Sequence, residues 1–163
     1  MSDEAKKQLE IYLQDHYAGA ISALELIEHS IEEHEGESLA AFFGELLSDV
    51  KADHEQLHNL MTALGFEESG TRNAGAWIAE KLGRAKIGFS GGDTSELRLL
   101  QTLETLYLGV AGKRLLWRSL LAAQDSSPVL ERTDFDRLAK RATEQLERIE
   151  AQRLKAAKES LGS

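Results

Sequence analysis

Apolar residues recur at alternating steps of three and four along four long segments of this chain, and this spacing constrains the fold more than any other feature. Such spacing places apolar side chains on one face of an α-helix, whereas a half-buried β-strand needs strict alternation. The chain has a single proline and few runs of β-branched residues, so long helices meet few interruptions. The pattern therefore predicts an all-α protein.

The first two segments, residues 3–34 and 38–64, predict an antiparallel pair of helices. Gly36 and Gly65 follow their last turns, where glycine commonly ends a helix. Only a few residues join the two segments. A short connection of this kind places consecutive helices side by side in opposite directions, so we expect a helical hairpin.

The last two segments predict a second hairpin. One begins with an N-cap pattern at residues 93–96 and continues to about residue 123, and the other starts at Pro128 or Asp134 and runs to residue 161. The earlier of these two helices is apolar on two stripes, so we expect it to be largely buried. Glycines 109 and 112 within it are expected to allow close approach of a neighbouring helix.

A long, glycine-rich crossover, residues 65–93, separates the two hairpins. Its middle part, "AGAWIAEKLGRAKI" at 74–87, is expected to form a short helix that packs Trp77 and Ile78 against the bundle. Two hairpins joined by one long crossover form the ferritin-like arrangement of a four-helix bundle. We therefore predict a single ferritin-like domain over residues 1–163.

Four stretches carry a family resemblance across nearly the whole chain: "DHYAGAISALEL" (15–26), "AWIAEKLGRAK" (76–86), "LYLGVAGKRLLW" (106–117) and "QLERIEAQR" (145–153). In these stretches the chain resembles a group of uncharacterised bacterial ferritin-like proteins. The resemblance implies the ferritin-like four-helix-bundle fold. It implies no established activity.

Composition narrows the classes of function. The chain has no cysteine, which excludes disulfides, thiolate zinc sites and thiol chemistry. The net charge of −9 argues against a nucleic-acid partner. The N-terminal residues contain no apolar leader, and no apolar run approaches the ~20 residues of a membrane span. We expect a cytoplasmic protein with no membrane partner.

Glu55 and His58 have the Glu-x-x-His spacing from which ferritin-like proteins build di-iron centres. On a helical wheel Glu55 points away from the apolar face of its helix and His58 lies to the side, so both are expected at the surface. Glu25, at the place of a usual ligand on the first helix, also points away. No histidine follows His58, so a second copy of the motif is missing.

His16 and Asp53 interrupt the apolar stripes of the first and second helices. The hairpin geometry places them within about one turn of each other, which predicts a His–Asp contact between these helices. One interpretation is a buried, hydrogen-bonded pair that sets the helix register. A second is a metal site of His16, Asp53 and His54, whose imidazoles and carboxylate suit zinc or iron. A third is proton transfer in a pocket.

Charged residues also interrupt the stripes of the second hairpin. Glu104 and Lys113 do so on its first helix, and Arg153 does so on its second. Folding the hairpin near residue 126 brings Glu104 opposite Arg148 and its neighbours. The simplest interpretation is a network of buried and half-buried ion pairs that ties the four helices together.

The alternative interpretation gathers these acids into one metal centre. Glu104 would join Glu147 or Glu150 of the last helix with His16 and Asp53 of the first hairpin. Such a centre would hold iron or manganese with a non-standard set of ligands.

We therefore expect a non-enzymatic helical bundle with a structural polar core. Ile11, Ile21 and Leu26 leave apolar surface on the outer side of the first helix, which suggests a homo-oligomer or another packing partner. The first alternative is a metal-dependent oxidase or a metal-storage protein. The second alternative is small-molecule binding between the helices.

Overall fold

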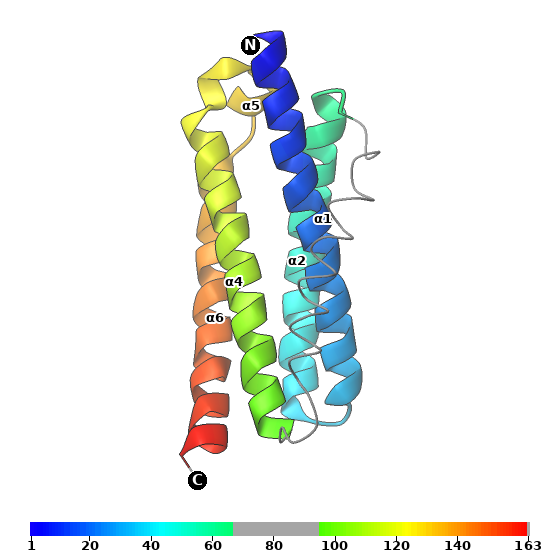
Figure 1. The fold of residues 1–163 in the computed structure, drawn as a ribbon, viewed down its shortest axis with the longest axis vertical. Helices are drawn as coiled ribbons and strands as arrows, with labels where there is room; N and C mark the ends of the chain where they lie inside the picture. The colour runs from blue at the N-terminus through cyan, green and yellow to red at the C-terminus, as the bar shows by residue number, and fades with distance from the viewer. Residues whose placement is uncertain (67–94, 163) are drawn as a thin grey trace.

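Residues 1–66 and 95–162 are described by this computed structural model, and they form helices and no strand. The long helices are α1 (Asp3–Glu33), α2 (Ser38–Ala63), α4 (Ser95–Ala122) and α6 (Phe135–Leu161) (Figure 1). The short elements η2 (Gln124–Ser126) and α5 (Pro128–Glu131) connect α4 to α6. The all-α prediction is confirmed for this part of the chain. None of the described helices is long and apolar enough to cross a membrane.

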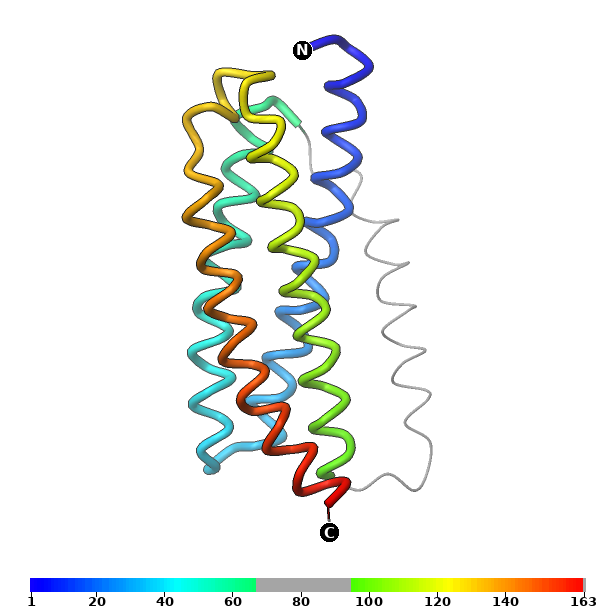
Figure 2. Tube along the Cα trace, turned by 90° about the vertical axis from the view of Figure 1, so that its left-hand side faces the viewer, coloured from blue at the N-terminus to red at the C-terminus, as the bar shows by residue number. Residues whose placement is uncertain are grey.

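The long helices form a bundle of two hairpins. α1 packs mainly on α2, α4 packs mainly on α6, and α1 also contacts α4. Figure 2 shows the four helices side by side, with the two chain termini at opposite ends of the bundle. Both hairpins are thus observed as predicted, with boundaries close to those expected. The proposed crossover helix with Trp77 and Ile78 lies outside the described residues.

The helix ends follow local chemistry in the sequence. Gly36 and Gly65 have φ values of 85° and 72°, a left-handed conformation that glycine adopts without a steric penalty. After α2, the N–H of Phe66 donates to the carbonyl of Met61 at 3.0 Å, and the N–H of Gly65 donates to that of Thr62 at 3.0 Å. This is the predicted Schellman ending.

The second hairpin turns through two capped helix starts. The Ser127 hydroxyl accepts from the N–H of Val129 at 3.3 Å, and Pro128 occupies the first turn of α5. The Asp134 carboxylate accepts from the N–H of Arg137 at 3.0 Å, which caps α6. Both predicted starts of the last helix are therefore observed, because the one-turn helix α5 precedes the long helix α6. The predicted N-cap residues of α4 at 93 and 94 lie outside the described part.

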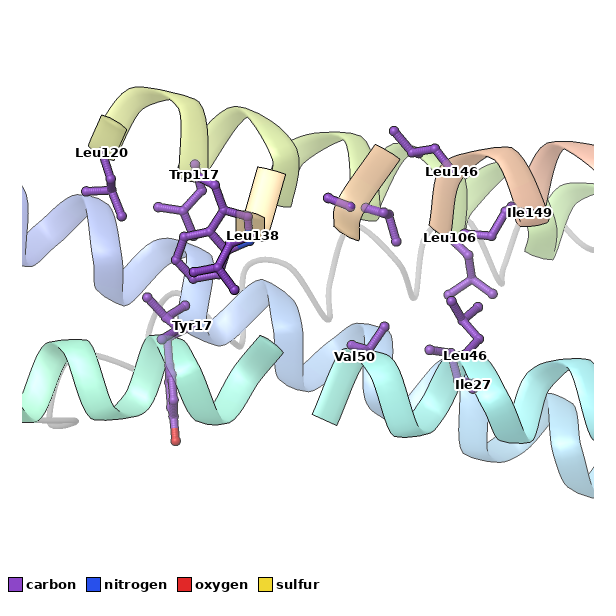
Figure 3. Packing of buried hydrophobic residues seen from close by; sticks show 14 of the residues in the cluster. Tyr17, Ile27, Leu46, Val50, Leu106, Trp117, Leu120, Leu138, Leu146 and Ile149 are labelled. Atoms are coloured by element: carbon purple, nitrogen blue, oxygen red, sulfur yellow. The ribbon is translucent and has the colours of Figure 1, made fainter. Parts of the chain in front are cut away.

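The core lies along the axis of the bundle, where all four long helices contribute side chains (Figure 3). Its largest fully buried members include Leu13, Ile27, Phe43, Leu46, Leu103, Trp117, Phe135 and Leu138. The rings of Trp117 and Phe135 stack with their centroids 6.2 Å apart, which joins α4 to α6. Apolar burial along these stripes is the main stabilising contribution to the fold.

One expectation for α4 is wrong. Its first stripe is buried, but Leu108 and Leu115 of the second stripe are 71% and 57% exposed. At Gly109 and Gly112 no atom of another described helix lies within 4 Å of the position that a Cβ would take, so no described helix approaches closely there. The reason is geometric, because α6 and the first hairpin cover only one side of α4.

Candidate functional site

Asp53 is the centre of the polar core. Its place in the apolar stripe of α2 buries it to 1% exposure, as the helical wheel predicted. Lys113 Nζ of α4 donates to Asp53 Oδ2 at 2.6 Å, and Gln145 Nε2 of α6 donates to the same oxygen at 2.8 Å. Arg141 Nη2 lies 3.3 Å from Asp53 Oδ1. One carboxylate of the first hairpin therefore binds both helices of the second.

Lys113 and Gln145 also bind each other. Lys113 Nζ donates to Gln145 Oε1 at 2.5 Å, so the glutamine amide uses its oxygen for the lysine and its nitrogen for Asp53. Burial lowers the pKa of Lys113, and the neighbouring Asp53 opposes that shift. We name Asp53, Lys113, Gln145 and Arg141 the Asp53 cluster. A buried carboxylate that is paired and hydrogen-bonded in this way is a structural element in most folds.

Further ion pairs connect the helices nearer the surface. Arg148 of α6 binds Asp49 of α2, and its Nη1 lies 3.9 Å from Glu45 Oε2 of the same helix. Lys51 Nζ of α2 lies 3.0 Å from Glu28 Oε1 of α1. The Asp53 cluster and the Arg148 pairs confirm part of the predicted network of ion pairs between helices, whereas the more exposed Lys51–Glu28 pair was not predicted.

Glu104 and Glu150 share one arginine. Arg153 donates from Nε to Glu150 Oε2 at 2.6 Å and from Nη2 to Glu150 Oε1 at 2.8 Å. Its Nη1 lies 3.5 Å from Glu104 Oε1 of α4. The hydrogen bond from Arg153 lowers the pKa of Glu150. Glu104 and Glu150 therefore both bind the guanidinium group of Arg153, whereas Glu147 is exposed on α6.

The two candidate histidines pack against tyrosine rings. His16 meets Tyr12 edge-on with ring centroids 4.8 Å apart, and His54 stacks on Tyr17 at 4.3 Å. No hydrogen bond joins the described side chains of His16 and Asp53, so the predicted His–Asp pair is wrong. Asp53 is turned toward the second hairpin, where a lysine ammonium is a stronger partner than a neutral imidazole.

Burial lowers the pKa of His16 below its ordinary value of 6.5, against a weaker opposing effect of Asp15. Between these two pKa values the unfolded chain binds more protons than the folded chain. The free energy of unfolding should therefore fall as the pH falls from about 7 through the lowered pKa. His16→Gln should remove this part of the pH dependence in urea titrations. His29→Gln, at a position with a 53% exposed side chain, should not.

If both variants keep the pH dependence of the unmodified protein, His16 is not the titrating group. If both variants lose it, the effect belongs to histidine content in general. Either result would contradict the expectation from burial.

The candidate metal ligands do not gather in one place. Among residues 1–66 and 95–162, no group of three or more His, Asp or Glu side chains could hold a metal ion. His16, His54 and Asp53 line one cavity, described below, without forming such a group, and Glu104, Glu147 and Glu150 lie at or near the surface of the second hairpin.

The Glu-x-x-His motif behaves largely as expected. Glu55 is exposed, which confirms its surface position, and Glu25 of α1 is exposed as well. His58 is half-buried, with its ring centroid 6.1 Å from that of Tyr17, so its predicted surface position is only partly correct.

A cavity of about 550 Å³ lies between α1, α2 and α4, beside the Asp53 cluster. Its walls are mostly apolar and include Ala20, Ala23, Ile27, Val50, Leu57, Leu106, Val110, Leu116 and Trp117. Its polar lining residues are Asp15, His16, Asp53, His54, Thr105 and Lys113. Small residues help to create this space, since Gly109 of α4 lines it without a side chain.

A buried donor with no acceptor among the described residues belongs to a side chain in the wall of the cavity. Trp117 lines the cavity and is only 1% exposed. Its indole N–H has no hydrogen-bond partner within the described ranges. Figure 3 shows the indole extending from α4 into the interior of the bundle. A buried N–H without an acceptor is uncommon in native proteins, where most buried donors have a hydrogen-bond partner.

Sequence reasoning found Asp53 and Lys113 as polar residues in apolar stripes, but it missed Gln145. A signal was present, because Gln145 lies in the same stripe of α6 as Ala142 and Ile149. The cavity gave no signal in the sequence apart from the small residues of α1 and α4.

Comparisons of the chain with protein-family models, with curated proteins and with solved structures give no match. The class of protein that the described residues define is an all-helical bundle with a charged core and an apolar cavity.

Proposed function

We propose that this protein is a non-enzymatic, ferritin-like helical bundle that binds a small, mainly apolar molecule between α1, α2 and α4. The observation that carries the proposal is the cavity of about 550 Å³ with apolar walls and a few polar side chains. Ligand sites in proteins typically have volumes of roughly 300–1,000 Å³ and this kind of lining.

The ferritin-like part of the proposal is supported by the arrangement of the hairpins. α1 packs on α2, α4 packs on α6, and the sequence between the hairpins is long enough for a crossover. The absence of cysteine fits the cytoplasm as the proposed location. The net charge of −9 fits a protein without a nucleic-acid partner.

The non-enzymatic part is supported by the pairing of the charged groups. Asp53 and Lys113 form a hydrogen-bonded ion pair, and Glu104 and Glu150 both form ion pairs with Arg153. A general base or a nucleophile needs a side chain that can reach a substrate proton or a reacting atom. The charged residues of this core instead bind one another.

N-phenylnaphthylamine, a neutral and apolar fluorophore, tests the proposal. We expect its emission to rise and shift to shorter wavelength with the protein, and we expect the melting temperature to rise by mass action. Ala23→Leu adds a side chain inside the cavity and should weaken binding at least about tenfold. Ala41→Leu is the matched control, because residue 41 is exposed on α2.

Equal loss of binding in both variants, or no binding to the unmodified protein, would overturn the proposed function. The metal-dependent alternative is tested on the same samples by elemental analysis after expression with added iron, manganese and zinc. If the protein contains near-stoichiometric iron or manganese, and His16→Ala and Asp53→Ala lose it, the result would contradict the ligand-binding proposal and support a metal centre.

A second candidate role, self-association, is favoured by the exposed apolar residues of α4. Leu108 and Leu115 lie two turns apart on one face of this helix. Ile11 of α1 is exposed as well, as expected from the sequence. Sedimentation velocity should then show a species heavier than one chain, and Leu115→Lys should shift it toward the monomer. A monomer at every concentration would contradict this role.

A further inference from the structure

The outward face of α4 is uncharged over about four helical turns. α4 lies between α1 and α6, and the face in question points away from both (Figure 1). Its residues, none of which is buried, are Leu108, Gly112, Leu115, Ser119 and Ala122. Leu108 and Leu115 are 71% and 57% exposed.

Helix faces that contact water usually carry charged and polar residues. The solvent face of α6 follows this rule, with exposed charges at Arg137, Lys140, Glu144, Glu147, Lys155 and Lys158. The outward face of α4 does not follow it. A face with exposed leucines and no charge is typical of a contact surface.

Two opposite charges lie beside this face, on the side toward α6. Glu104 has a 50% exposed side chain, 3.5 Å from Arg153 of α6. Arg118 lies 14 residues, or about four turns, further along α4, so it lies on nearly the same side of the helix. It is exposed and has no ion-pair partner among the described residues. The face is therefore acidic at one end of this edge and basic at the other.

A second copy of this face complements the first when the two α4 helices run in opposite directions. Leu108 and Leu115 are equally far from the point between residues 111 and 112, so a two-fold axis at that point places each opposite the other. The same axis places Glu104 opposite residue 119, within one residue of Arg118 of the partner subunit. By symmetry this contact between opposite charges occurs twice.

Gly112 lies next to this axis. No atom of another described helix lies within 4 Å of the position that its Cβ would take. The distance between packed helices depends on the side chains at the contact, so a glycine there lets two α4 backbones approach closely. Parallel helices would instead place Glu104 and Arg118 each against its own copy, where like charges repel.

We propose that the protein forms a homodimer through α4, with the two helices antiparallel and Glu104 of each chain paired with Arg118 of the other. This inference rests on the proposed self-association and adds the contact surface, its symmetry and the residues that set the direction. One pair of helices buries less than the ~800 Å² per partner of a standard interface, so we expect a dissociation constant of about 10 µM or weaker.

Arg118→Glu tests the charge contacts. It places two acids opposite each other at both ends of the interface, and we expect it to raise the dissociation constant roughly tenfold. Sedimentation equilibrium from about 1 µM to about 1 mM measures this, and the effect should shrink at high salt. Lys140→Glu is the matched control, because it makes the same change in net charge at an exposed position of α6. It should change the constant by no more than about twofold.

The double variant Glu104→Arg/Arg118→Glu exchanges the two charges within each chain. Opposite charges then face each other again in the antiparallel dimer, so the dissociation constant should return to within about threefold of its original value. Melting curves check that the chain is folded, since Glu104 also contacts Arg153. A folded double variant that dimerises as weakly as Arg118→Glu would overturn the Glu104–Arg118 contact.

Cross-linking tests the direction of the helices. The chain has no cysteine, so an introduced cysteine is unique. Gln101 and Ala122 are equally far from the two-fold axis, so a mixture of Gln101→Cys and Ala122→Cys chains should be cross-linked by a short bismaleimide. Two copies of Ala122→Cys lie about 30 Å apart in the antiparallel dimer and should not be cross-linked.

The remaining outcomes separate this inference from self-association in general. A dimer weakened equally by Arg118→Glu and Lys140→Glu, or cross-linked efficiently by Ala122→Cys alone, would overturn the antiparallel arrangement and leave self-association standing. A monomer at every concentration would overturn both, and this face would then belong to another occupant, such as residues 67–94 of the same chain.

Discussion

Replacing Asp53 with asparagine is expected to lower the free energy of unfolding by about 3 to 5 kcal/mol. Asparagine keeps the shape of the side chain and removes its charge. Lys113 would then remain buried in the core without its carboxylate partner, and Arg141 would lose the same partner. Equilibrium unfolding in urea, followed by circular dichroism, measures the change.

Two further variants show whether the loss comes from the buried charges. Lys51→Met removes a pair with Glu28 in which both side chains are about half exposed, and it should change stability by no more than about 0.5 kcal/mol. Replacing Asp53, Lys113 and Gln145 together with leucine, methionine and leucine should recover most of the loss, because no buried charge of that trio remains. A loss below about 1 kcal/mol for Asp53→Asn would contradict the structural role of the Asp53 cluster.

Trp117→Ala is expected to cost about 3 to 5 kcal/mol as well, for a different reason. The indole is buried to 1% exposure and stacks on Phe135 with ring centroids 6.2 Å apart. Its removal exchanges packed apolar surface for a larger cavity beside the existing one. The loss should appear as a lower urea midpoint with a similar dependence on denaturant.

Leu115→Ala is the matched control for this change. Leu115 lies on the same helix only two positions away, yet it is 57% exposed. Its truncation should cost about 0.5 kcal/mol or less. Similar losses for the two variants would mean that the helix tolerates side-chain loss equally on both faces, contrary to the packing described for α4.

Most of the fold could be predicted from spacing alone. The periodic stripes predicted most of the buried residues of α2 and α6, but on α1 they missed the buried Tyr17, Ser22 and Ser30. Local chemistry at Gly65 and Ser127 predicted where helices end and begin. These features depend on residues close in sequence. For the same reason Asp53 could be placed in the core, since its angle on the helix follows from its position relative to Leu57.

The partners of Asp53 could not be predicted, because they depend on how one hairpin is rotated against the other. The hairpin geometry alone favoured His16, whereas the carboxylate binds Lys113 and Gln145 of the opposite hairpin. The cavity likewise depends on the distance between α1 and α4, which no local pattern encodes. Exposure of Leu108 escaped prediction for the same reason.

The Asp53 cluster also bears on how the chain assembles. Its hydrogen bonds between the two hairpins join residues 60 and 92 positions apart, whereas the connections within the hairpins span only residues 34–37 and 123–134. Local contacts form sooner than distant ones, so we expect the two hairpins to meet after each has formed. Sliding one past the other by a single helical turn, about 5.4 Å, would place the carboxylate opposite Val110 or Trp117 of α4 instead of Lys113. The Asp53 cluster would therefore disfavour packing of the two hairpins in a shifted register, which the apolar stripes alone would permit.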